Sequence, residues 1–489
     1  MKGLRIMNTI EFYEPNKIEK KIKRTKIITT IGPSTNGKDE IRKLYESGMN
    51  VVRLNFSHGK YEEHEQKIKA CLELREELGK PISILLDTKG PEIRVGKMID
   101  GSQEIKAGSD VRIYTSSKEY QERECKGTEM TVSYDMSLDL KPGDTVLVDD
   151  GKLTLNVLNV ESGIVLCRAF NTHVVKTNKR INLPGVDFSL PFLSEKDIAD
   201  IKFGIDKGID YIAASFVNSA DNVNQIREIL KEKKATHIQI ISKIESKIGI
   251  FNIDSIVEAS DGIMIARGDL GLEIPYYEVP YWEKQIIRKC RKAGKIAIVA
   301  TQMLESMTDN PQPTRAEVTD VYYATELGAD ATMLSGESAT GIYPFITTQT
   351  MATINKRAEL SYYGKIYYDR ALEIARSTSS GKRAEIADEL ANITRNGKYE
   401  FAVILSRTGE LLKTISKFRP NVTILGVCQE ENLWNAFGAW HSIFMNKVDD
   451  IDKCWTNQEE INEIARFWGV KKGEEFLVVR SEEIKVCKL

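Results

Sequence analysis

The sequence predicts an α/β protein whose centre is a closed (β/α)8 barrel, with an all-β lid inserted after the third strand and an open α/β domain at the C-terminal end. Three observations lead to this prediction. Short apolar segments recur along the chain, each followed by a turn and an amphipathic segment. One interval instead holds closely spaced hairpins, and the spacing of the strands changes near residue 352.

Eight apolar segments have the length and the flanking turns of buried strands. They begin at Lys26, Asn50, Ile82, Tyr211, Ile238, Gly262, Ile296 and Ala331. Amphipathic segments such as residues 61–78, 194–207 and 314–327 lie between them and have the periodicity of helices. Eight alternating units of strand and helix are typical of a (β/α)8 barrel, which we assign to residues 24–89 and 185–352.

The alternation of strand-like and helix-like segments is interrupted over residues 90–184. Turn sequences such as "IDGSQ", "KPGD" and "ESG" separate short runs such as "DTVLV" and "LTLNVLNV", a pattern typical of hairpins. Inserted after the third strand, such a module would cover the C-terminal mouth of the barrel. Residues 353–489 contain four more strand-like runs and are predicted to form a separate domain: "YEFAVILS", "VTILGVC", "HSIFMN" and "EFLVVR". Residues 1–23 are charged and are predicted to be a tail.

The composition excludes several classes of protein. The 69 Lys and Arg residues nearly balance the 71 Asp and Glu residues, which argues against a general nucleic-acid or membrane-surface binder. No run of about 18 apolar residues predicts a membrane span, and the N-terminus lacks the apolar core of a signal peptide, so we expect a cytoplasmic protein. The seven Cys residues lie far apart without a CxxC pair, which favours reduced thiols over disulfides or a zinc site.

Polar side chains stand at the ends of the predicted barrel strands. Lys243 and Glu245 are two positions apart in "IISKIES" and therefore share one face of a strand. Other strands end in the same way: Arg53, Asn55, Ser57, Asp87, Thr88, Asp269, Thr301, Ser335 and Glu337. A structural ion pair could explain Lys243 and Glu245 alone. Because unpaired buried charges cost several kcal/mol each, so many at one rim predict a functional site there.

These residue types suit phosphate chemistry. Glu245 and Asp269 offer hard oxygen ligands for one Mg²⁺ or Mn²⁺, while Arg53 and Lys243 offer positive charge for a phosphoryl group. A second oxygen-rich cluster holds one carboxylate and fits a monovalent cation better than another divalent one: Asn55, Ser57, Asp87 and Thr88. In "ARGDLGLEI", the backbone N–H groups of a helix start could hold a substrate carboxylate.

Several long motifs resemble those of pyruvate kinases. They occur in the family's order and cover about Lys26 to Tyr343: "RLNFSHG", "LDTKGPEIR", "NLPGVDFSLPFLSEKD", "ISKIES", "GIMIARGDLG", "ATQMLESM", "PTRAEVTDV" and "MLSGESATGIYP". The resemblance implies the barrel, lid and C-terminal domain predicted above, and a homotetramer. It also implies transfer of the phosphoryl group of phosphoenolpyruvate to ADP, the last step of glycolysis.

The resemblance implies a role for each matching position. Lys243 would stabilise the charge of the moving phosphoryl group, Arg53 would hold its oxygens, and Thr301 would help to deliver a proton to the enolate through water. Substrate contacts are also expected from Ala266, Arg267, Gly268, Asp269 and Ser335, the first three largely through the backbone. Glu245 and Asp269 would bind Mg²⁺ or Mn²⁺.

The nucleotide and potassium sites are implied in the same way. The nucleotide would contact Asn55, His58, Arg94 and Lys179, and K⁺ would be bound by Asn55, Ser57, Asp87 and Thr88. Members with Glu at the position of Glu92 generally depend on potassium, so K⁺ activation is expected.

Two stretches depart from the family pattern. Arg180 stands in "KRINLPG" where members usually have Gly, which changes the backbone freedom where the lid returns to the barrel. In "TGELLK", which aligns with a Ser/Thr-rich effector loop, Glu410 would repel a phosphate, so sugar-phosphate activation is not expected at that loop. The aromatic segment "ENLWNAFGAWHSIFM" is better explained by packing or a subunit contact than by a cofactor.

Two alternatives remain open. A magnesium-dependent barrel lyase acting on pyruvate-like enolates would share the metal carboxylates and the carboxylate-binding loop, but it would need neither the lid nor "DTKGPEIR". A non-catalytic regulatory protein on the same fold would have no reason to keep Lys243, Glu245, Asp269 and Thr301 together.

Overall fold

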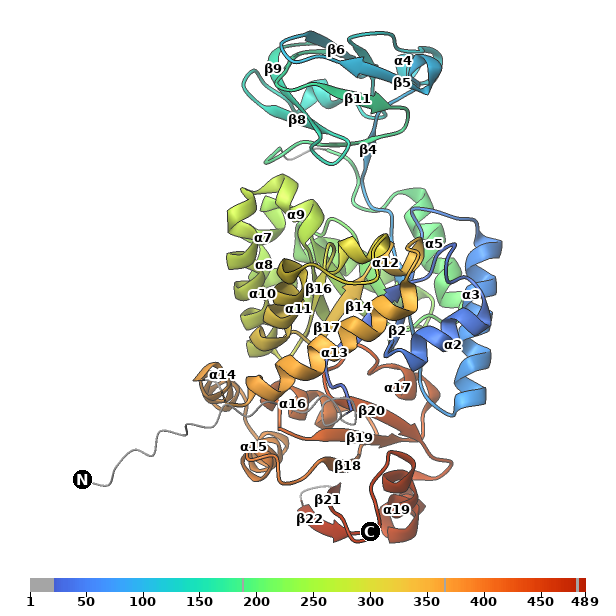
Figure 1. Ribbon diagram of the computed structural model, residues 1–489, viewed down its shortest axis with the longest axis vertical. Helices are drawn as coiled ribbons and strands as arrows, with labels where there is room; N and C mark the ends of the chain where they lie inside the picture. Colours follow the sequence, from blue (N-terminus) through green and yellow to red (C-terminus); the bar gives the residue numbers. More distant parts are fainter. Residues whose placement is uncertain (1–21, 187–188, 365, 481–482) are drawn as a thin grey trace, which may run out of the picture.

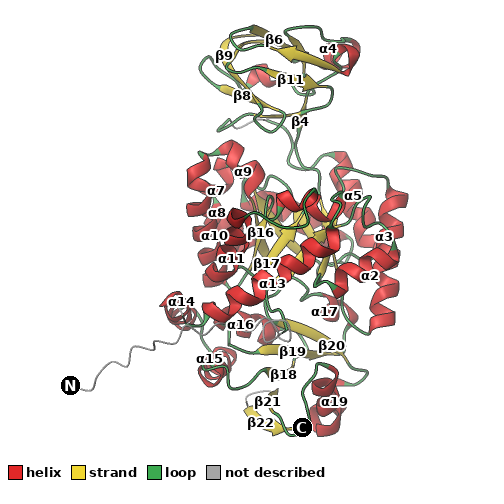
Figure 2. Cartoon of the chain, viewed as in Figure 1, coloured by secondary structure: helices red, strands yellow, loops and turns green. Residues whose placement is uncertain are grey.

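The computed structural model describes residues 22–186, 189–364, 366–480 and 483–489, arranged in three tiers (Figure 1). A β-rich module stands at the top, a barrel surrounded by helices occupies the middle, and a second sheet with helices lies below (Figure 2). The tail predicted over residues 1–23 falls outside the described residues except for its last two. The fold class predicted from the sequence is confirmed.

The barrel consists of eight parallel strands, and all eight predicted strands are present: β1 (Lys26–Thr30), β2 (Val51–Asn55), β3 (Ser83–Asp87), β13 (Tyr211–Ala214), β14 (Gln239–Ile244), β15 (Gly262–Ala266), β16 (Ile296–Ala300) and β17 (Ala331–Leu334). The strand β1 pairs with both β2 and β17, which closes the barrel. Both faces of most strands are buried, which explains their nearly continuous apolar sequences.

Helices surround the barrel and connect its strands: α2 (Lys38–Glu46), α3 (Tyr61–Leu78), α5 (Glu195–Lys207), α6 (Ala220–Glu232), α7 (Lys247–Phe251), α8 (Ile253–Ala259), α9 (Arg267–Glu273), α10 (Val279–Ala293), α11 (Arg315–Leu327), α12 (Gly336–Ala339) and α13 (Pro344–Tyr362). The predicted helices over residues 194–207 and 314–327 begin one residue later than expected. Ser194 and Thr314 are their N-caps, and each forms a capping box with the acidic residue three positions on.

The lid is a mainly antiparallel module with its own apolar core, in which only the described pair β6 and β7 is parallel. Its larger sheet has the order β4–β12–β8–β9–β10–β6–β7 and its smaller sheet pairs β11 with β5. The strands are β4 (Ile93–Arg94), β5 (Ser102–Ile105), β6 (Asp110–Tyr114), β7 (Glu129–Thr131), β8 (Thr145–Val148), β9 (Leu153–Glu161), β10 (Ile164–Ala169), β11 (His173–Lys176) and β12 (Arg180–Asn182), with the helix α4 (Ser117–Glu122) at one end. The chain leaves the barrel through β4 and returns through β12, and these two strands pair with each other. Residues at the base of this pair therefore face the mouth of the barrel.

The C-terminal part contains a five-stranded sheet in the order β20–β19–β18–β21–β22. Its elements are α14 (Ile366–Ser377), α15 (Lys382–Thr394), β18 (Phe401–Leu405), α16 (Glu410–Phe418), β19 (Thr423–Cys428), α17 (Glu431–Asn435), β20 (Ile443–Lys447), α18 (Ile451–Thr456), α19 (Gln458–Phe467), β21 (Glu475–Arg480) and β22 (Glu483–Lys488). Four of these strands were predicted, and the antiparallel strand β22 was missed. The helix α13 continues without a break across residue 352, where the sequence predicted the last domain to begin.

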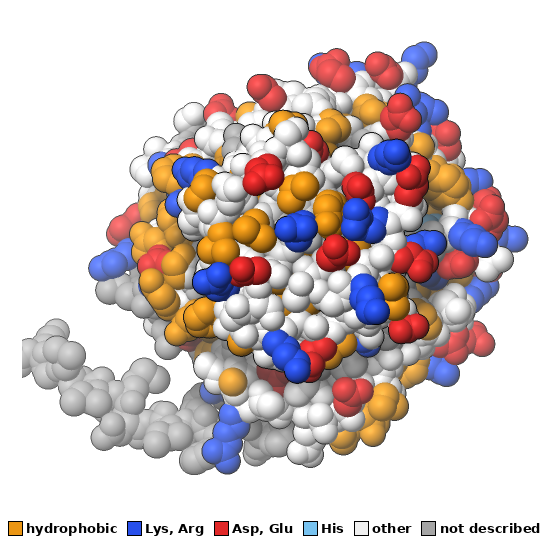
Figure 3. Space-filling model, turned by 90° about the horizontal axis from the view of Figure 1, so that it is seen from above, with side chains coloured by type: hydrophobic (Ala, Val, Ile, Leu, Met, Phe, Trp, Pro, Cys, Tyr) orange, Lys and Arg blue, Asp and Glu red, His pale blue; other side chains and the backbone are white. Residues whose placement is uncertain are grey.

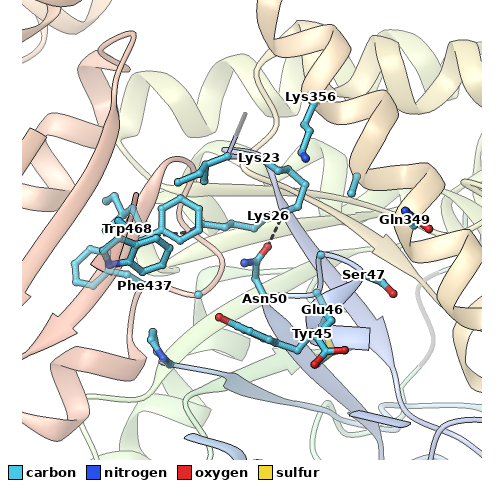
Figure 4. A pocket seen from close by; sticks show the side chains of 18 of the residues that line it. Lys23, Lys26, Tyr45, Glu46, Ser47, Asn50, Gln349, Lys356, Phe437 and Trp468 are labelled. Atoms are coloured by element: carbon cyan, nitrogen blue, oxygen red, sulfur yellow. Dashed lines mark hydrogen bonds between the residues drawn. The ribbon is translucent and has the colours of Figure 1, made fainter. Parts of the chain in front are cut away.

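The aromatic segment after α17 packs under the barrel. The Trp440 indole donates a hydrogen bond to Gln239 Oε1 at 3.1 Å, and the Tyr211 hydroxyl donates to the Ala436 carbonyl at 2.5 Å. A cavity of about 520 Å³ lies nearby, between the base of the barrel and the C-terminal part (Figure 4). Two buried lysines line this cavity. Lys23 Nζ donates to Asn50 Oδ1 at 2.7 Å, and Lys26 Nζ donates to the Ile443 carbonyl at 2.6 Å.

The distribution of charged side chains on the surface agrees with the nearly equal numbers of acidic and basic residues. Seen from above, acidic and basic side chains are interspersed over the exposed face (Figure 3). None of the helices in the described ranges has the length and apolar character needed to cross a bilayer.

Candidate active site

A cavity of about 310 Å³ opens where the C-terminal ends of the barrel strands meet the base of the lid. Its lining includes most of the predicted site: Arg53, Asn55, Ser57, His58, Asp87, Thr88, Arg94, Lys179, Lys243, Glu245 and Asp269. The remaining lining residues are Lys89, Glu92, Asp149, Asp150, Arg180, Ser215 and Phe216. The barrel therefore gathers side chains that are far apart in the sequence, as expected for residues at the ends of parallel strands.

Lys243 lies at the centre of a buried ionic network. Its Nζ is 3.0 Å from Asp87 Oδ1 and 3.1 Å from Glu245 Oε1, and it donates to Ser215 Oγ at 2.8 Å. Burial alone would lower the pKa of Lys243, but the charges of Asp87 and Glu245 outweigh burial and raise it. Lys243 is therefore a charged ammonium held at the floor of the cavity.

Asp87 joins Lys243 to Arg53. Arg53 Nε donates to Asp87 Oδ2 at 2.7 Å, so the two carboxylate oxygens of Asp87 face two different cations. Burial would raise the pKa of the Asp87 carboxyl, but the charges of Arg53 and Lys243 outweigh it and lower the pKa. Both cations are thus oriented by one carboxylate that stays ionised.

Glu245 and Asp269 are the two carboxylates that could hold a divalent metal. Glu245 Oε2 accepts a hydrogen bond from the Phe216 backbone N–H at 2.7 Å, and Phe216 has a left-handed conformation (φ 56°). Burial raises the pKa of Glu245 to about 7; the charge of Lys243 opposes this shift and that of Asp269 adds to it. Both carboxylates line the same cavity.

This donor set fits a divalent cation. Mg²⁺ prefers oxygen ligands and is commonly held by one or two carboxylates, with substrate and water completing its shell. Burial is the main cause of the raised pKa of Glu245, and a cation bound there would favour the ionised carboxylate. Within the described ranges, no group of three or more His, Cys, Asp or Glu side chains has metal-binding geometry, so the pair is a partial site rather than a complete protein cage.

Arg180 of the lid contacts Asp269, one of these two carboxylates. Its Nη1 is 2.5 Å from Asp269 Oδ1, and its guanidinium carbon lies 4.8 Å from the centre of the Phe216 ring. The sequence identified Arg180 only as a departure from the family pattern at the return of the lid. The structure shows that the departure places a cation on one of the predicted metal ligands.

The four predicted potassium ligands line the same cavity as Lys243. The Ser57 backbone N–H donates to Asn55 Oδ1 at 3.1 Å, and Thr88 Oγ1 accepts from the Ser215 backbone N–H at 3.0 Å. Together with Asp87 they contribute oxygen atoms to the lining of the cavity.

The predicted nucleotide residues are held by the lid and the rim. Lys179 Nζ lies 2.8 Å from Asp149 Oδ1, and Arg94 Nη2 lies 2.7 Å from Glu92 Oε2. His173 Nε2 contacts the other oxygen of Asp149 at 2.9 Å. Each predicted phosphate-binding cation is therefore pre-oriented by a carboxylate.

Six predicted residues are not part of the cavity lining: Ala266, Arg267, Gly268, Thr301, Ser335 and Glu337. Thr301 follows β16 in a left-handed conformation (φ 69°); its Oγ1 accepts from the Gly268 N–H at 2.7 Å and donates to the Ala300 carbonyl at 2.6 Å. Arg267 points away, to Asp320 at 2.5 Å and Glu283 at 3.2 Å.

Sequence reasoning missed Ser215, Phe216 and Asp149. Ser215 and Phe216 directly follow β13, and the sequence "AASFVNS" contains no charge that would mark them. Their position directly after a barrel strand was the one sequence feature that could have indicated a place in the site. Asp149 belongs to a lid turn, "DDGK", whose placement over the barrel has no local sequence signal.

Most of the chain is similar in sequence and in fold to known proteins. The family model described as the barrel domain of pyruvate kinase matches residues 22–348. A pyruvate kinase from Mycoplasma pneumoniae is 41% identical over 463 residues, which is 88% of this chain and 90% of the relative, and one from Dictyostelium discoideum is 45% identical over 415 residues, covering 83% and 80%. The crystal structure of a pyruvate kinase from Cryptosporidium parvum superposes with a TM-score of 0.88 at 32% identity and covers 97% of each chain. The chain therefore belongs to the pyruvate kinase family, whose members use a metal cofactor to transfer the phosphoryl group of phosphoenolpyruvate to ADP.

Proposed function

We propose that the cavity beneath the lid is where this chain transfers the phosphoryl group, and that Lys243 and Arg53 carry the central roles. The observation that supports this most directly is the network in which Asp87 and Glu245 hold the Lys243 ammonium at the cavity floor. During its transfer, a phosphoryl group carries negative charge on its oxygens, and cations held in fixed positions stabilise that charge. Arg53, fixed by the same Asp87, would hold the oxygens in line.

The metal roles follow from the carboxylates. A Mg²⁺ or Mn²⁺ ion bound to Glu245 and Asp269 would supply the charge that neutralises the substrate carboxylate, the enolate oxygen and the phosphoryl oxygens. K⁺ would be held by Asn55, Ser57, Asp87 and Thr88, all of which line the cavity. The presence of Glu92, which bonds Arg94 at the rim, supports potassium dependence.

Nucleotide binding would involve the lid. Asn55 and His58 lie on the barrel side of the cavity, whereas Arg94 and Lys179 come from the two connections of the lid. ADP bound between them would bring its phosphates beneath the lid and exclude water. Exclusion matters because a phosphoryl group exposed to water is hydrolysed instead of transferred.

The residues that follow β15 and β16 would bind the substrate carboxylate and deliver the proton. The backbone of Ala266, Arg267 and Gly268 would hold the substrate carboxylate, with Ser335 nearby at the end of β17. The Thr301 hydroxyl, oriented by Gly268 and Ala300, would pass a proton through water to the enolate carbon once the phosphoryl group has left. Arg267 would act by positioning, since Asp320 and Glu283 hold its side chain.

We also propose that the chain forms a homotetramer in the cytoplasm. Its proposed domains are the barrel (residues 24–89 and 185–352), the lid (90–184) and the C-terminal domain (353–489). Exposed aromatic side chains at Phe251, Tyr276 and Tyr277 offer surfaces for subunit contact. All seven cysteines are free thiols, which suits a reducing compartment.

The test of the site is Lys243→Met, assayed by pyruvate formation from phosphoenolpyruvate and ADP with Mg²⁺ and K⁺ present. Loss of this cation should reduce turnover by roughly 10³-fold or more. Lys247→Met, at an exposed position one turn further along the chain, is the matched control and should keep full activity. A Lys243→Met turnover within about tenfold of the wild type would refute the assignment. A lyase or a regulatory protein would form no pyruvate in the wild-type assay.

A further inference from the structure

The lid turn at residues 149–152, which connects β8 to β9, has a strained backbone. Three consecutive residues adopt the left-handed conformation: Asp149 (φ 54°), Asp150 (φ 55°) and Gly151 (φ 79°). Glycine adopts this conformation freely, whereas a residue with a Cβ atom adopts it at a cost in free energy. Both aspartates line the active-site cavity. Strain of this kind persists where the surrounding structure fixes the backbone, so the contacts that hold the turn bear on the site.

The connection between β10 and β11 holds this turn at both ends. Asn171 Nδ2 donates to the Lys152 carbonyl at 2.7 Å, and Asn171 Oδ1 accepts from the Thr154 backbone N–H at 3.0 Å. His173, the first residue of β11, places its Nε2 2.9 Å from Asp149 Oδ2. Figure 1 shows β8 and β11 together in the lid, above the barrel. The contact of His173 is the one that reaches a residue of the active-site cavity.

The Asp149 carboxylate is shared between His173 and Lys179. Lys179 Nζ lies 2.8 Å from Oδ1, whereas His173 contacts Oδ2. Burial would raise the pKa of the Asp149 carboxyl, but the hydrogen bonds from Lys179 and His173 outweigh burial and lower the pKa. An ionised carboxylate only accepts hydrogen bonds, so His173 Nε2 carries a proton and donates it to Oδ2. The ammonium of Lys152 lies 3.9 Å from the same oxygen on a largely exposed side chain and contributes little.

Lys179 has to serve both Asp149 and a nucleotide phosphate. Its side chain is 36% exposed, whereas that of Asp149 is 7% exposed, so the carboxylate is fixed and the ammonium can turn toward a ligand. How strongly Asp149 attracts Lys179 depends on how much of the carboxylate charge another donor already satisfies. Without His173, the buried Oδ2 would lose its closest donor, and Lys179 would be held more tightly to compensate.

We propose that His173 is a positioning residue for the nucleotide: it fixes Asp149 and the strained turn, and thereby keeps Lys179 available to the phosphates of ADP. This inference rests on the proposed role of Lys179 as a nucleotide contact. His173 does not line the cavity, so it acts through Asp149 and Lys179 rather than on the nucleotide. The turn that it fixes also lies against the barrel, since a methyl group placed on Gly151 would lie 3.1 Å from Leu272 Cδ2 of α9.

The test is calorimetric titration of the full-length protein with ADP, in the presence of Mg²⁺ and K⁺. His173→Leu keeps an apolar side chain without a donor, and loss of a hydrogen bond to a buried carboxylate should weaken ADP binding about tenfold. His173→Gln, whose amide Nε2 can still donate, should recover most of the affinity. The KM for ADP should follow the same order, whereas the KM for phosphoenolpyruvate should not change. Lys176→Met, at an exposed position of the same strand, is the matched control and should bind ADP as the wild type does.

A double-mutant cycle with Lys179→Met separates positioning from general damage to the lid. If His173 acts through Lys179, adding His173→Leu to Lys179→Met should weaken ADP binding no further. Additive effects of the two changes, or wild-type ADP affinity in His173→Leu, would overturn the inference and leave Lys179 as a nucleotide contact. Wild-type ADP affinity in Lys179→Met would instead remove the proposed nucleotide contact, and the inference with it. His173→Asn, whose amide is too short to reach Asp149, takes the place of His173→Leu in the cycle if the apolar variant does not fold.

Discussion

Arg180 is the residue whose removal gives the sharpest prediction about metal binding. Its guanidinium bonds Asp269 and lies over Phe216, so it occupies the positive position beside a proposed metal ligand. A divalent cation bound to Asp269 must displace this guanidinium or share the carboxylate with it. Arg180→Met keeps a long apolar side chain over the Phe216 ring but removes the charge. We therefore expect this variant to bind divalent metal more tightly than the wild type when substrates are absent.

The magnitude follows from the contact. A hydrogen bond between charged groups contributes about 1.5–3 kcal/mol, and partial exposure reduces that value through solvent screening. The side chains of Arg180 and Asp269 are 17% and 22% exposed, so the lower end of the range applies. About 1.5 kcal/mol corresponds to roughly tenfold in affinity.

The assay is titration of the protein with Mn²⁺, with free Mn²⁺ followed by electron paramagnetic resonance. Arg94→Met is the matched control, because Arg94 is also a lid cation of the cavity but bonds Glu92 instead of a metal carboxylate. Its Mn²⁺ affinity should equal that of the wild type. If Arg180→Met binds Mn²⁺ as weakly as the wild type, or more weakly, Arg180 does not compete for Asp269 and the reasoning is wrong.

Two further predictions concern the same cavity. Since the pKa of Glu245 is raised to about 7, the carboxyl is mostly protonated below pH 7 and must lose its proton to bind metal; Mn²⁺ affinity should be about tenfold weaker at pH 6 than at pH 8, and a pH-independent affinity would count against Glu245 as a ligand. Replacing K⁺ by Na⁺ should reduce turnover of the wild type strongly and of Glu92→Lys little; equal rates of the wild type in the two salts would contradict the assigned potassium site.

Most of the fold could be predicted because its elements carry strong local patterns. The barrel strands are buried on both faces and read as apolar runs, and α3 has the predicted bounds 61–78. The strand β22 (Glu483–Lys488) was missed because "EIKVCK" is an exposed edge strand in which charged residues separate the apolar ones. An edge strand gains its place from pairing with β21, which is a tertiary contact without a sequence signal.

The site was predictable wherever chemistry falls at a strand end. Lys243, Glu245, Asp87 and Arg53 meet because closure of a parallel barrel brings the ends of all its strands to one rim. Partners supplied by the lid could not be predicted, because the orientation of an inserted module depends on packing between distant segments. Arg180 illustrates the limit: its identity was unusual in the sequence, but only the pairing of β4 with β12 places it on Asp269.

The charges of the cavity explain why such a site needs metal ions. Its lining holds six basic side chains and six acidic ones: Arg53, Lys89, Arg94, Lys179, Arg180 and Lys243 against Asp87, Glu92, Asp149, Asp150, Glu245 and Asp269. The formal charges of the lining therefore balance when all the carboxyl groups are ionised, and each proposed phosphate-binding cation is already paired to a carboxylate. Phosphoenolpyruvate and ADP both bring several negative charges, and burying them uncompensated would cost several kcal/mol. Cations bound at the proposed ligands Glu245 and Asp269 would remove this penalty and would free Arg180 from Asp269, so metal binding and substrate binding should strengthen each other.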